Sequence, residues 1–393
     1  KTWKQITNGI ASTHFTRCLR ADKNRNGLLY CGTEYGMYIS YDDGNSWKPF
    51  QLNLPMVPIT DLTIKDNDLV VATQGRSFWV LDDLTLVQQA DQDFKSKKIY
   101  AFPVNPSYAM GGSRNVNARN AGFNPPNGAV INYYLKEAPD SALVSITVTD
   151  ARKKLIRTYS TIPKPKEEKL EVNPGMNQFV WNMIYAPSET IEGLILWNGN
   201  VPGPKAAPGQ YFYKIKSGKD SAEGSFIIRQ NPNYKLSQGD ADAKFTFLLT
   251  VRDKFTEMQT TIKNIREIRK QLNDFTARLP KDSSRDVKEV KAAADSILKK
   301  ITSIEEALYQ TKAKSPQDVL NYPIRLNDKI SGLYDYAASG NTAPTKQVLE
   351  VYNDLAAQAD IQLNKFKQVL DLDLKAFNQL VKQKTFPVIG IIE

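Results

Sequence analysis

From about residue 240 to the C-terminus, apolar residues recur at steps of three, four and seven, which places their side chains on one face of an α-helix. The spacing predicts helices over residues 251–279 and 287–308, the second behind a capping Ser284. It predicts a third over 322–339, ended by Gly340, and a fourth that has Pro344 in its first turn and continues to 380. Four amphipathic helices with short polar connections predict an antiparallel four-helix bundle over residues 236–393.

The first 235 residues show a different pattern, in which short runs of β-branched and aromatic residues are separated by Asn, Asp, Gly and Pro turns. Runs at residues 27–33, 36–40 and 68–73 predict strands of about five residues within residues 1–90. Between residues 91 and 235, about seven similar runs predict an immunoglobulin-like or fibronectin-like β-sandwich. The fold class expected is therefore multidomain, β followed by α.

Within residues 1–90 the strand pattern repeats. Trp3-Lys4 recurs as Trp47-Lys48 at a separation of 44 residues, and residues 29–33 resemble residues 69–73. The second match continues with residues 38–43 against 78–83, which aligns Asp42 with Asp82. Periods of about 40 to 45 residues with several short strands are typical of β-propeller blades. This region is thus predicted to form about two blades of a propeller, fewer than the four to eight of a closed one.

Residues 40–47 carry a turn motif. Ser40, Asp42, Gly44 and Trp47 follow the spacing S-x-D-x-G-x-x-W. In a tight turn, Asp42 would accept backbone N–H bonds, Gly44 would supply a positive φ, and Trp47 would cap the core of the blade. These four residues are expected to stabilise the fold and not to catalyse a reaction.

This spacing resembles the Asp box in the BNR repeats of sialidases, sortilin-like proteins and related β-propellers. Residues 14–84 are similar to the last blades of large bacterial BNR-repeat proteins labelled glycosyl hydrolase or sortilin-like. The resemblance implies a following β-sandwich and a C-terminal helical region, so it covers nearly the whole chain. The second box is degenerate, because Val80 replaces Ser and Leu84 replaces Gly.

Trp3 resembles the end of a preceding Asp box. On this interpretation most of the propeller lies outside the sequence, and two blades alone would leave a sheet face and an edge exposed. We therefore expect a partner for that flank, either a missing N-terminal portion of the propeller or another protein chain.

The charge and hydropathy of the chain bear on two classes of partner, nucleic acids and membranes. Lys and Arg number 52 against 42 Asp and Glu, a net charge of +10. The basic residues are mostly lysines spread among acids, without the Arg and aromatic stripe of a phosphate-tracking surface, so nucleic-acid binding is not expected. The mean hydropathy is −0.44, and no run approaches the roughly 18 apolar residues of a membrane-spanning helix. The family resemblance implies a bacterial protein that is secreted, periplasmic or at the cell surface.

Candidate chemistry is sparse. A glycosidase needs two carboxylates about 5 to 10 Å apart, and the candidates are Glu34, Asp82 and Asp83. Glu34 is the only weak catalytic candidate, because Asp82 aligns with the structural Asp42, and a surface acid is the interpretation we favour even for Glu34. Side chains expected near it that suit contact with a sugar are Tyr35, Arg76 and Trp79.

His14 is the only histidine, so neither a Ser-His-Asp triad nor a zinc site is supported, and a hydrogen-bonded strand histidine is expected. Cys18 and Cys31 are the only cysteines. With residues 22–27 as a hairpin loop they face each other, which allows either a disulfide or two buried thiols. No nucleotide-binding, C-x-x-C or H-E-x-x-H motif is present in the sequence, so no cofactor and no metal are expected.

Two functions follow from these patterns. The first is a binding or structural module, the C-terminal part of an Asp-box propeller protein without a complete active site, with carbohydrate as one class of ligand. The alternative is part of a glycoside hydrolase, sialidase-like or xyloglucanase-like, whose catalytic pocket is completed by missing N-terminal blades.

Overall fold

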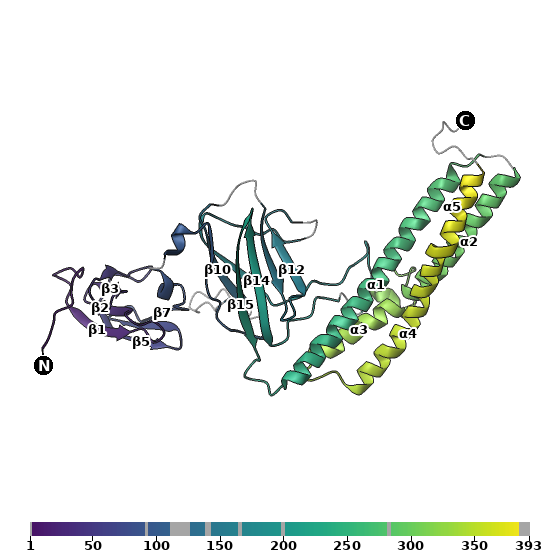
Figure 1. The fold of residues 1–393 in the computed structure, drawn as a ribbon. Coiled ribbons are helices and arrows are strands. Elements are labelled where there is room, and N and C mark those ends of the chain that lie inside the picture. Colours follow the sequence, from purple (N-terminus) through teal and green to yellow (C-terminus); the bar gives the residue numbers. More distant parts are fainter. Residues whose placement is uncertain are drawn as a thin grey trace. The chain divides into compact units, whose positions relative to one another are not determined.

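A computed structural model describes residues 2–90, 93–110, 126–137, 143–163, 167–197, 201–280 and 284–384. The chain combines antiparallel β-sheets with C-terminal helices, which confirms the mixed β and α class (Figure 1). It divides into two compact units. One unit comprises Lys1–Ser107, Gly111–Asn182 and Gln210–Ile227, and the other comprises Tyr108–Met110, Met183–Gly209 and Ile228–Glu393.

Two antiparallel sheets occupy the N-terminal region. The first has the order β1-β2-β3-β4 and the second the order β5-β6-β7. Their bounds are β1 Thr16–Ala21, β2 Leu29–Thr33, β3 Gly36–Ser40, β4 Lys48–Pro49, β5 Ile59–Lys65, β6 Asp68–Thr73 and β7 Phe78–Leu81. Because successive side chains on a strand point to opposite faces, each sheet can present an apolar face to the other. Apolar side chains from both sheets form one buried cluster, the shared core, which includes Tyr30, Met37 and Ile39 from the first sheet and Ile59, Leu62 and Leu69 from the second.

The first hairpin has a longer loop than the sequence indicated. Ala21 pairs with Leu29, so the loop comprises residues 22–28, and this register places Cys18 opposite Gly32 and Leu19 opposite Cys31. Cys18 therefore lies against the shared core, while Cys31 belongs to a separate cluster around Trp47 on the other face. Both thiols are free, so of the two alternatives the structure has the thiols and not the disulfide. Burial raises the pKa of both, that of Cys31 to about 11.

The strand register also corrects the repeat. Leu29 pairs with Ser40 in the first sheet, whereas Leu69 pairs with Leu81 in the second. The hairpin of β6 and β7 is thus one residue longer than that of β2 and β3, because its turn at residues 74–77 holds an additional residue. After that turn, each residue of the first sheet matches the residue 41 positions later, and not 40. The residue equivalent to Asp42 is therefore Asp83, and the predicted match of Asp42 with Asp82 is wrong.

Strands β8 to β15, between residues 99 and 229, form two further sheets, of orders β13-β10-β8 and β12-β11-β14-β15-β9. In β11 the alternate residues Val144, Ile146 and Val148 are fully buried, as the period of two predicts. The indole of Trp181 in β13 lies 5.6 Å from the ring of Tyr211 and 5.8 Å from that of Phe226, so the two sheets meet through aromatic side chains. The bounds are β8 Ile99–Ala101, β9 Ser107–Tyr108, β10 Ala129–Leu135, β11 Val144–Thr149, β12 Leu155–Ser160, β13 Gly175–Trp181, β14 Gly209–Ser217 and β15 Asp220–Arg229, preceded by short 3₁₀ turns at Val87–Gln89 and Asp93–Ser96.

Helices α1, α2 and α4 begin at residues whose side chains cap them. The side chains of Ser237, Ser284 and Thr345 accept hydrogen bonds from the first turns of α1, α2 and α4. Pro344 consequently precedes the cap of α4 and lies two positions before its first residue, outside the helical turn in which it was predicted. The bounds are α1 Gln238–Ala277, α2 Arg285–Leu308, a 3₁₀ turn Pro316–Leu320, α3 Leu326–Ser339, α4 Lys346–Gln368, a π turn Val369–Asp373 and α5 Leu374–Gln383.

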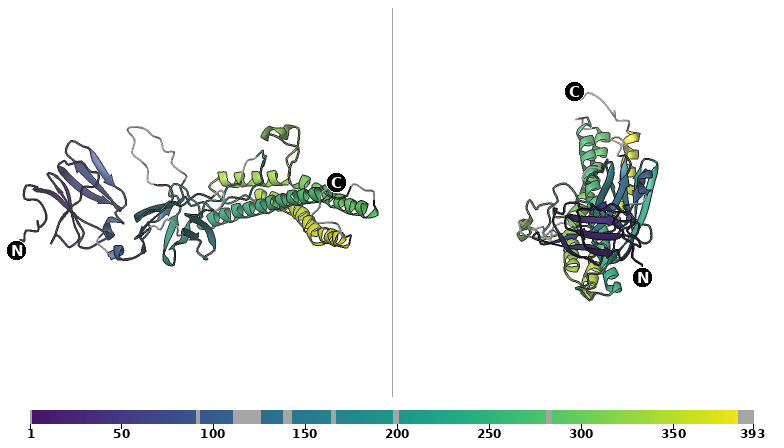
Figure 2. Two further views of the ribbon diagram at one scale, coloured as in Figure 1. Left: turned by 90° about the horizontal axis from the view of Figure 1, so that it is seen from above. Right: turned by 90° about the vertical axis from the view of Figure 1, so that its left-hand side faces the viewer.

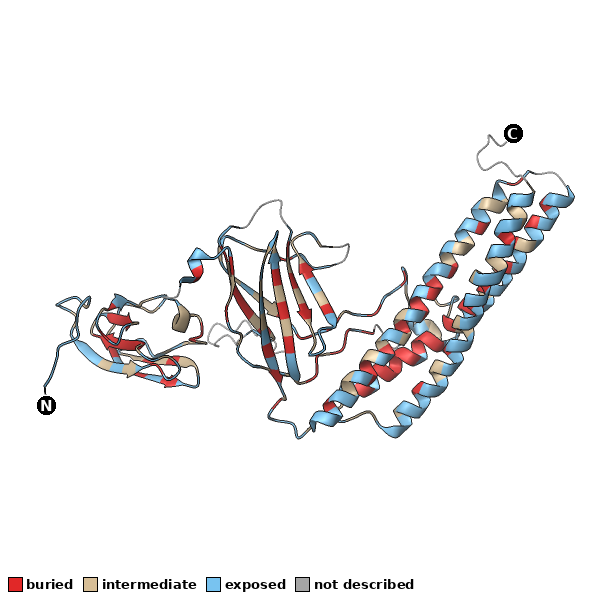
Figure 3. Cartoon of the chain, in the orientation of Figure 1, coloured by how far each residue is buried: buried red, intermediate tan, exposed pale blue. Residues whose placement is uncertain are grey.

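The longest helix, α1, packs against α2, α3 and α4 (Figures 1 and 2). Buried residues form stripes along the facing sides of the helices (Figure 3). The π turn is continuous with α4 and α5, so these three elements form one helical run. The side chains of this run that are buried in the helical core are those of Tyr352, Ala359, Phe366, Val369 and Phe377.

One segment predicted to belong to the sandwich groups with the helices instead. Met183–Gly209 lies inside the predicted range 91–235, yet its apolar residues Ile191, Leu196 and Val201 join the helical core. The backbone N–H of Trp197 donates to Asp328 in α3, over 2.8 Å. These contacts explain why the segment belongs to the same compact unit as the helices.

Candidate functional site

The turn that follows β3 is held by its own side chains. The hydroxyl of Ser40 donates to Asp42 over 2.8 Å and accepts the backbone N–H of Gly44 over 2.9 Å. Asp42 also accepts the hydroxyl and the backbone N–H of Ser46, at 2.5 and 2.9 Å. These bonds favour the carboxylate and lower the pKa of Asp42 to about 2, with Ser46 as the largest cause. Gly44 has a φ of +85°, a conformation that glycine adopts without strain.

Trp47 closes the cluster on the outer face of the first sheet. It is 5% exposed and packs with Leu29, Cys31 and Tyr38. Its indole N–H donates to the carbonyl of Ile6 over 2.7 Å, so an N-terminal segment lies beside it. Trp3, which has the same Trp-Lys sequence, is 95% exposed.

The acids at this end of the sheets accept hydrogen bonds within the fold. Asp83 accepts from the amides of Asn67 and Asn105 and from the backbone N–H of Thr85. Asp82, in contrast, is exposed. The two carboxyls therefore differ in role, and the register assigns the structural one to Asp83.

A second polar network, at the same end of the sheets as the turn after β3, was not predicted from the sequence. Asp22, 9% exposed, accepts the hydroxyl of Tyr30 over 3.0 Å and the side-chain amide of Gln88. Gln88 also donates to Asn67. Burial and the neighbouring Asp22 raise the pKa of Tyr30. The network ties the first hairpin loop to the chain after β7, and only the tertiary packing brings these residues together.

The opposite end of the sheets carries the candidate acid and several exposed rings. Glu34 forms an ion pair with Arg17. Tyr35 stacks on His14 with ring centroids 4.8 Å apart, and the Nδ1 atom of His14 lies 2.9 Å from the hydroxyl of Tyr38. Phe15 is 60% exposed, with the guanidinium of Arg17 5.5 Å from its ring centre. We call the residues His14, Phe15, Arg17, Glu34 and Tyr35 the aromatic rim.

Phe15 and Arg17 were not identified from the sequence. Thr16 pairs with Thr33, and the backbone N–H of Glu34 donates to the carbonyl of Phe15 over 3.1 Å. The pairing of the two strands therefore brings Phe15 and Arg17 to Glu34, and this register is not visible in the sequence. His14 is hydrogen-bonded to Tyr38, as expected, but it lies before β1 and not in a strand.

Of the other two predicted contact residues, Arg76 lies in the turn between β6 and β7 and Trp79 lies in β7. The indole N–H of Trp79 donates to the carbonyl of Arg76 over 2.9 Å, and the half-buried ring packs against the shared core. Within the described part of the chain, no hydrogen bond, ion pair or ring contact joins Arg76 or Trp79 to Glu34 or Tyr35. The two turns are nevertheless at the same end of the sheets, because the loop between β4 and β5 bonds to both of them, at Gly36 and at Gln74.

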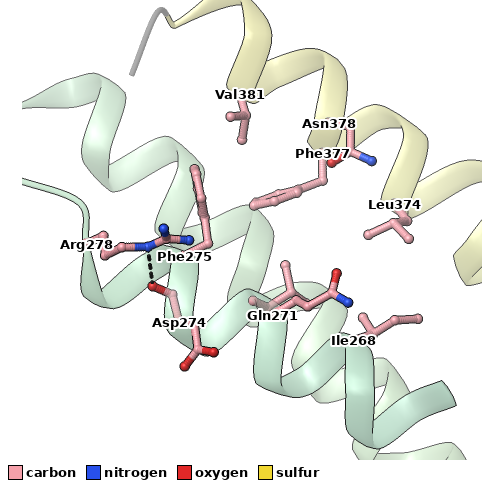
Figure 4. A pocket seen from close by; sticks show the side chains of 10 residues that line it. Ile268, Gln271, Asp274, Phe275, Arg278, Leu374, Phe377, Asn378 and Val381 are labelled. Atoms are coloured by element: carbon pink, nitrogen blue, oxygen red, sulfur yellow. Dashed lines mark hydrogen bonds between the residues drawn. The ribbon is translucent and has the colours of Figure 1, made fainter. Parts of the chain in front are cut away.

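A groove of about 360 Å³ lies between α1 and α5 (Figure 4). Its apolar walls include Ile268, Phe275 and Phe377, and the two phenyl rings are 5.8 Å apart. Arg278 at its edge donates to the carbonyl of Asp274 over 3.1 Å. The groove holds one carboxylate among mainly apolar side chains, so it offers no acid–base pair.

In the residues that the structure describes, no group of three or more His, Cys, Asp or Glu side chains is placed to hold a metal ion. None of the described helices combines the length and the hydrophobicity that a membrane span requires. A scan against protein-family models gave no match, and a search of curated proteins found none either.

Proposed function

We propose that residues 1–90 form two neighbouring blades of an Asp-box β-propeller and that the chain acts as a binding or structural module. Three observations support this assignment. The two sheets stack through one shared core, their strands repeat with a period of about 40 residues, and the turn after β3 has the bonds expected of an Asp box. The motif residues Ser40, Asp42, Gly44 and Trp47 then have a stabilising role.

The aromatic rim is the ligand surface in this proposal, and oligosaccharides are the ligand class that its chemistry suits. The single observation that carries this proposal is the half-exposed Tyr35, whose ring is fixed by His14 while 49% of the residue stays accessible. A fixed aromatic ring loses little entropy when the apolar face of a sugar stacks on it. Arg17 and Glu34 beside it supply hydrogen-bond donors and acceptors for hydroxyl groups.

Binding without hydrolysis is the function we favour over a glycosidase. The carboxylate of Glu34 is already engaged by Arg17, Asp83 accepts hydrogen bonds within its own turn, and the exposed Asp82 follows β7 at the end of the sheets opposite Glu34. A retaining or inverting mechanism needs a second free carboxylate across the sugar. Glu34 is therefore assigned to orienting Arg17.

The test is calorimetric titration of the full chain with sialyllactose and with xyloglucan oligosaccharides, together with a reducing-sugar assay. We expect binding of at least one glycan without release of product, and an affinity about two- to tenfold lower for Tyr35→Ala. Tyr336→Ala is the matched control, since Tyr336 is 76% exposed on α3. Unchanged binding by Tyr35→Ala would overturn the rim as the ligand surface. Product release that Glu34→Gln abolishes would support the glycoside hydrolase instead.

The remaining parts of the assignment follow the family resemblance. We propose that the sheets of residues 99–229 form an immunoglobulin-like or fibronectin-like sandwich and that the helices form an antiparallel four-helix bundle. We also propose a location outside the cytoplasm, which is the setting of the proteins that the Asp-box pattern resembles, and a partner for the blades from further propeller sequence or another chain.

A further inference from the structure

The outer edge of β7 is open. Among the described residues no strand pairs with this edge, whereas in the first sheet β4 covers the corresponding edge of β3. Phe78 and Val80 on β7 are 76% and 54% exposed. An apolar edge strand of this kind is a template for pairing with another extended segment.

The first sheet shows what such an edge accepts. Lys48 of β4 pairs with Ile39, and Trp47, the residue before it, is buried beside Tyr38. The N–H of Phe50, just after β4, donates to the carbonyl of Met37 over 2.8 Å. Since backbone groups alternate in direction along a strand, the N–H and C=O of Met37 and Ile39 face β4. By register the equivalent residues on the second sheet are Phe78 and Val80.

The chain contains a second copy of the covering segment. Thr2-Trp3-Lys4 matches Ser46-Trp47-Lys48 in its Trp-Lys pair and in the small hydroxyl residue before it. Trp3 is 95% exposed, so a large apolar side chain is in contact with solvent. Burying such a residue is worth on the order of several times the thermal energy.

We propose that Trp3-Lys4-Gln5 of one molecule adds as a fourth strand to the open edge of β7 in a second copy of this chain. The register of β4 places Lys4 opposite Val80 and Gln5 opposite Trp79. The indole of Trp3 then packs beside the half-buried Trp79 and Leu81, as Trp47 packs beside Tyr38. The contact is head to tail, because the donating segment and the accepting edge are different surfaces. It does not depend on a ligand at the aromatic rim.

Sedimentation of residues 1–393 between about 1 and 100 µM tests this contact. We expect the wild-type chain to associate with rising concentration. Trp3→Ala, which removes the donated side chain, and Val80→Lys, which places a like charge opposite Lys4, are each expected to remain monomeric. Both positions are exposed, and circular dichroism checks that the variants stay folded. Leu320→Ala is the matched control, since Leu320 is 82% exposed elsewhere and its variant should associate like the wild type.

Mixing the two variants gives the sharper result. The Val80→Lys chain keeps an intact Trp3 segment, and the Trp3→Ala chain keeps an intact β7 edge, so an equimolar mixture has one productive contact. We expect a 1:1 dimer that does not grow further. The proposal is overturned if the wild-type chain is monomeric throughout the range, if either variant associates like the wild type, or if the mixture stays monomeric.

Discussion

Glu305 lies in the interior of the helical unit with both carboxylate oxygens in use. Its side chain is 4% exposed and bridges two arginines of α1, at 2.8 Å to Arg266 and 2.6 Å to Arg269. We predict that Glu305→Ala destabilises the helices, because the two guanidinium groups lose the charge that compensates for their removal from water.

The magnitude follows from the burial of the partners. Breaking a buried ion pair typically costs about 3–5 kcal/mol. The arginine side chains are 37% and 28% exposed, so they can turn partly to water and the cost should lie near the lower end, about 3 kcal/mol. For a unit of this size that corresponds to a fall in Tm of roughly 6–12 °C. Glu305→Gln keeps an acceptor for one arginine and should cost about 1–2 kcal/mol.

The assay is urea unfolding followed by far-UV circular dichroism, which is dominated by the helices. Glu306→Ala is the matched control, since Glu306 is the next residue on the same helix and is exposed, and it should stay within about 0.5 kcal/mol of the wild type. If Glu305→Ala falls within about 1 kcal/mol of that control, the buried bridge does not stabilise the helices as argued.

Two further predictions concern the turn after β3. Asp42→Asn should lower the free energy of unfolding at neutral pH and leave it nearly unchanged near pH 2. The folded state lowers the pKa of Asp42 from 3.8 to about 2. The carboxylate therefore stabilises the fold above pH 3.8, and this contribution is lost as the pH falls through about 2. Tryptophan fluorescence during urea unfolding at both pH values checks this, and an equal loss at both would contradict it. Gly44→Ala should cost about 1–2 kcal/mol, because an alanine is strained at φ +85° and its Cβ would lie 2.7 Å from Ile6. Gly75→Ala, with φ +81° and open space around it, separates the backbone strain from the contact, and a milder effect at position 44 than at 75 would refute the contact.

Local patterns predicted the helical elements well. The apolar spacing and Ser284 define α2 because a helix cap and a helix face are properties of neighbouring residues. The turn chemistry of Asp42 and Gly44 was visible for the same reason.

Features that depend on register were not predictable in this way. One additional residue in the turn before β7 transfers the structural role from Asp82 to Asp83, and one additional residue in the loop between β1 and β2 moves Cys18 out of line with Cys31. Neither changes the hydrophobic alternation by which strands are recognised. The aromatic rim was found only in part, since Tyr35 and Glu34 were named while Phe15 and Arg17 needed the strand pairing.

The π turn at Val369–Asp373 constrains the chain through its length. A π turn holds one more residue than an α-helical turn, so everything after it is rotated by about 100° about the helix axis compared with a straight continuation. Phe377 meets Phe275 because of that rotation. Deletion of one residue from this turn would therefore rotate the whole of α5 away from its packing partners. Substitution of one exposed side chain, such as that of Leu372, would leave the orientation of α5 unchanged.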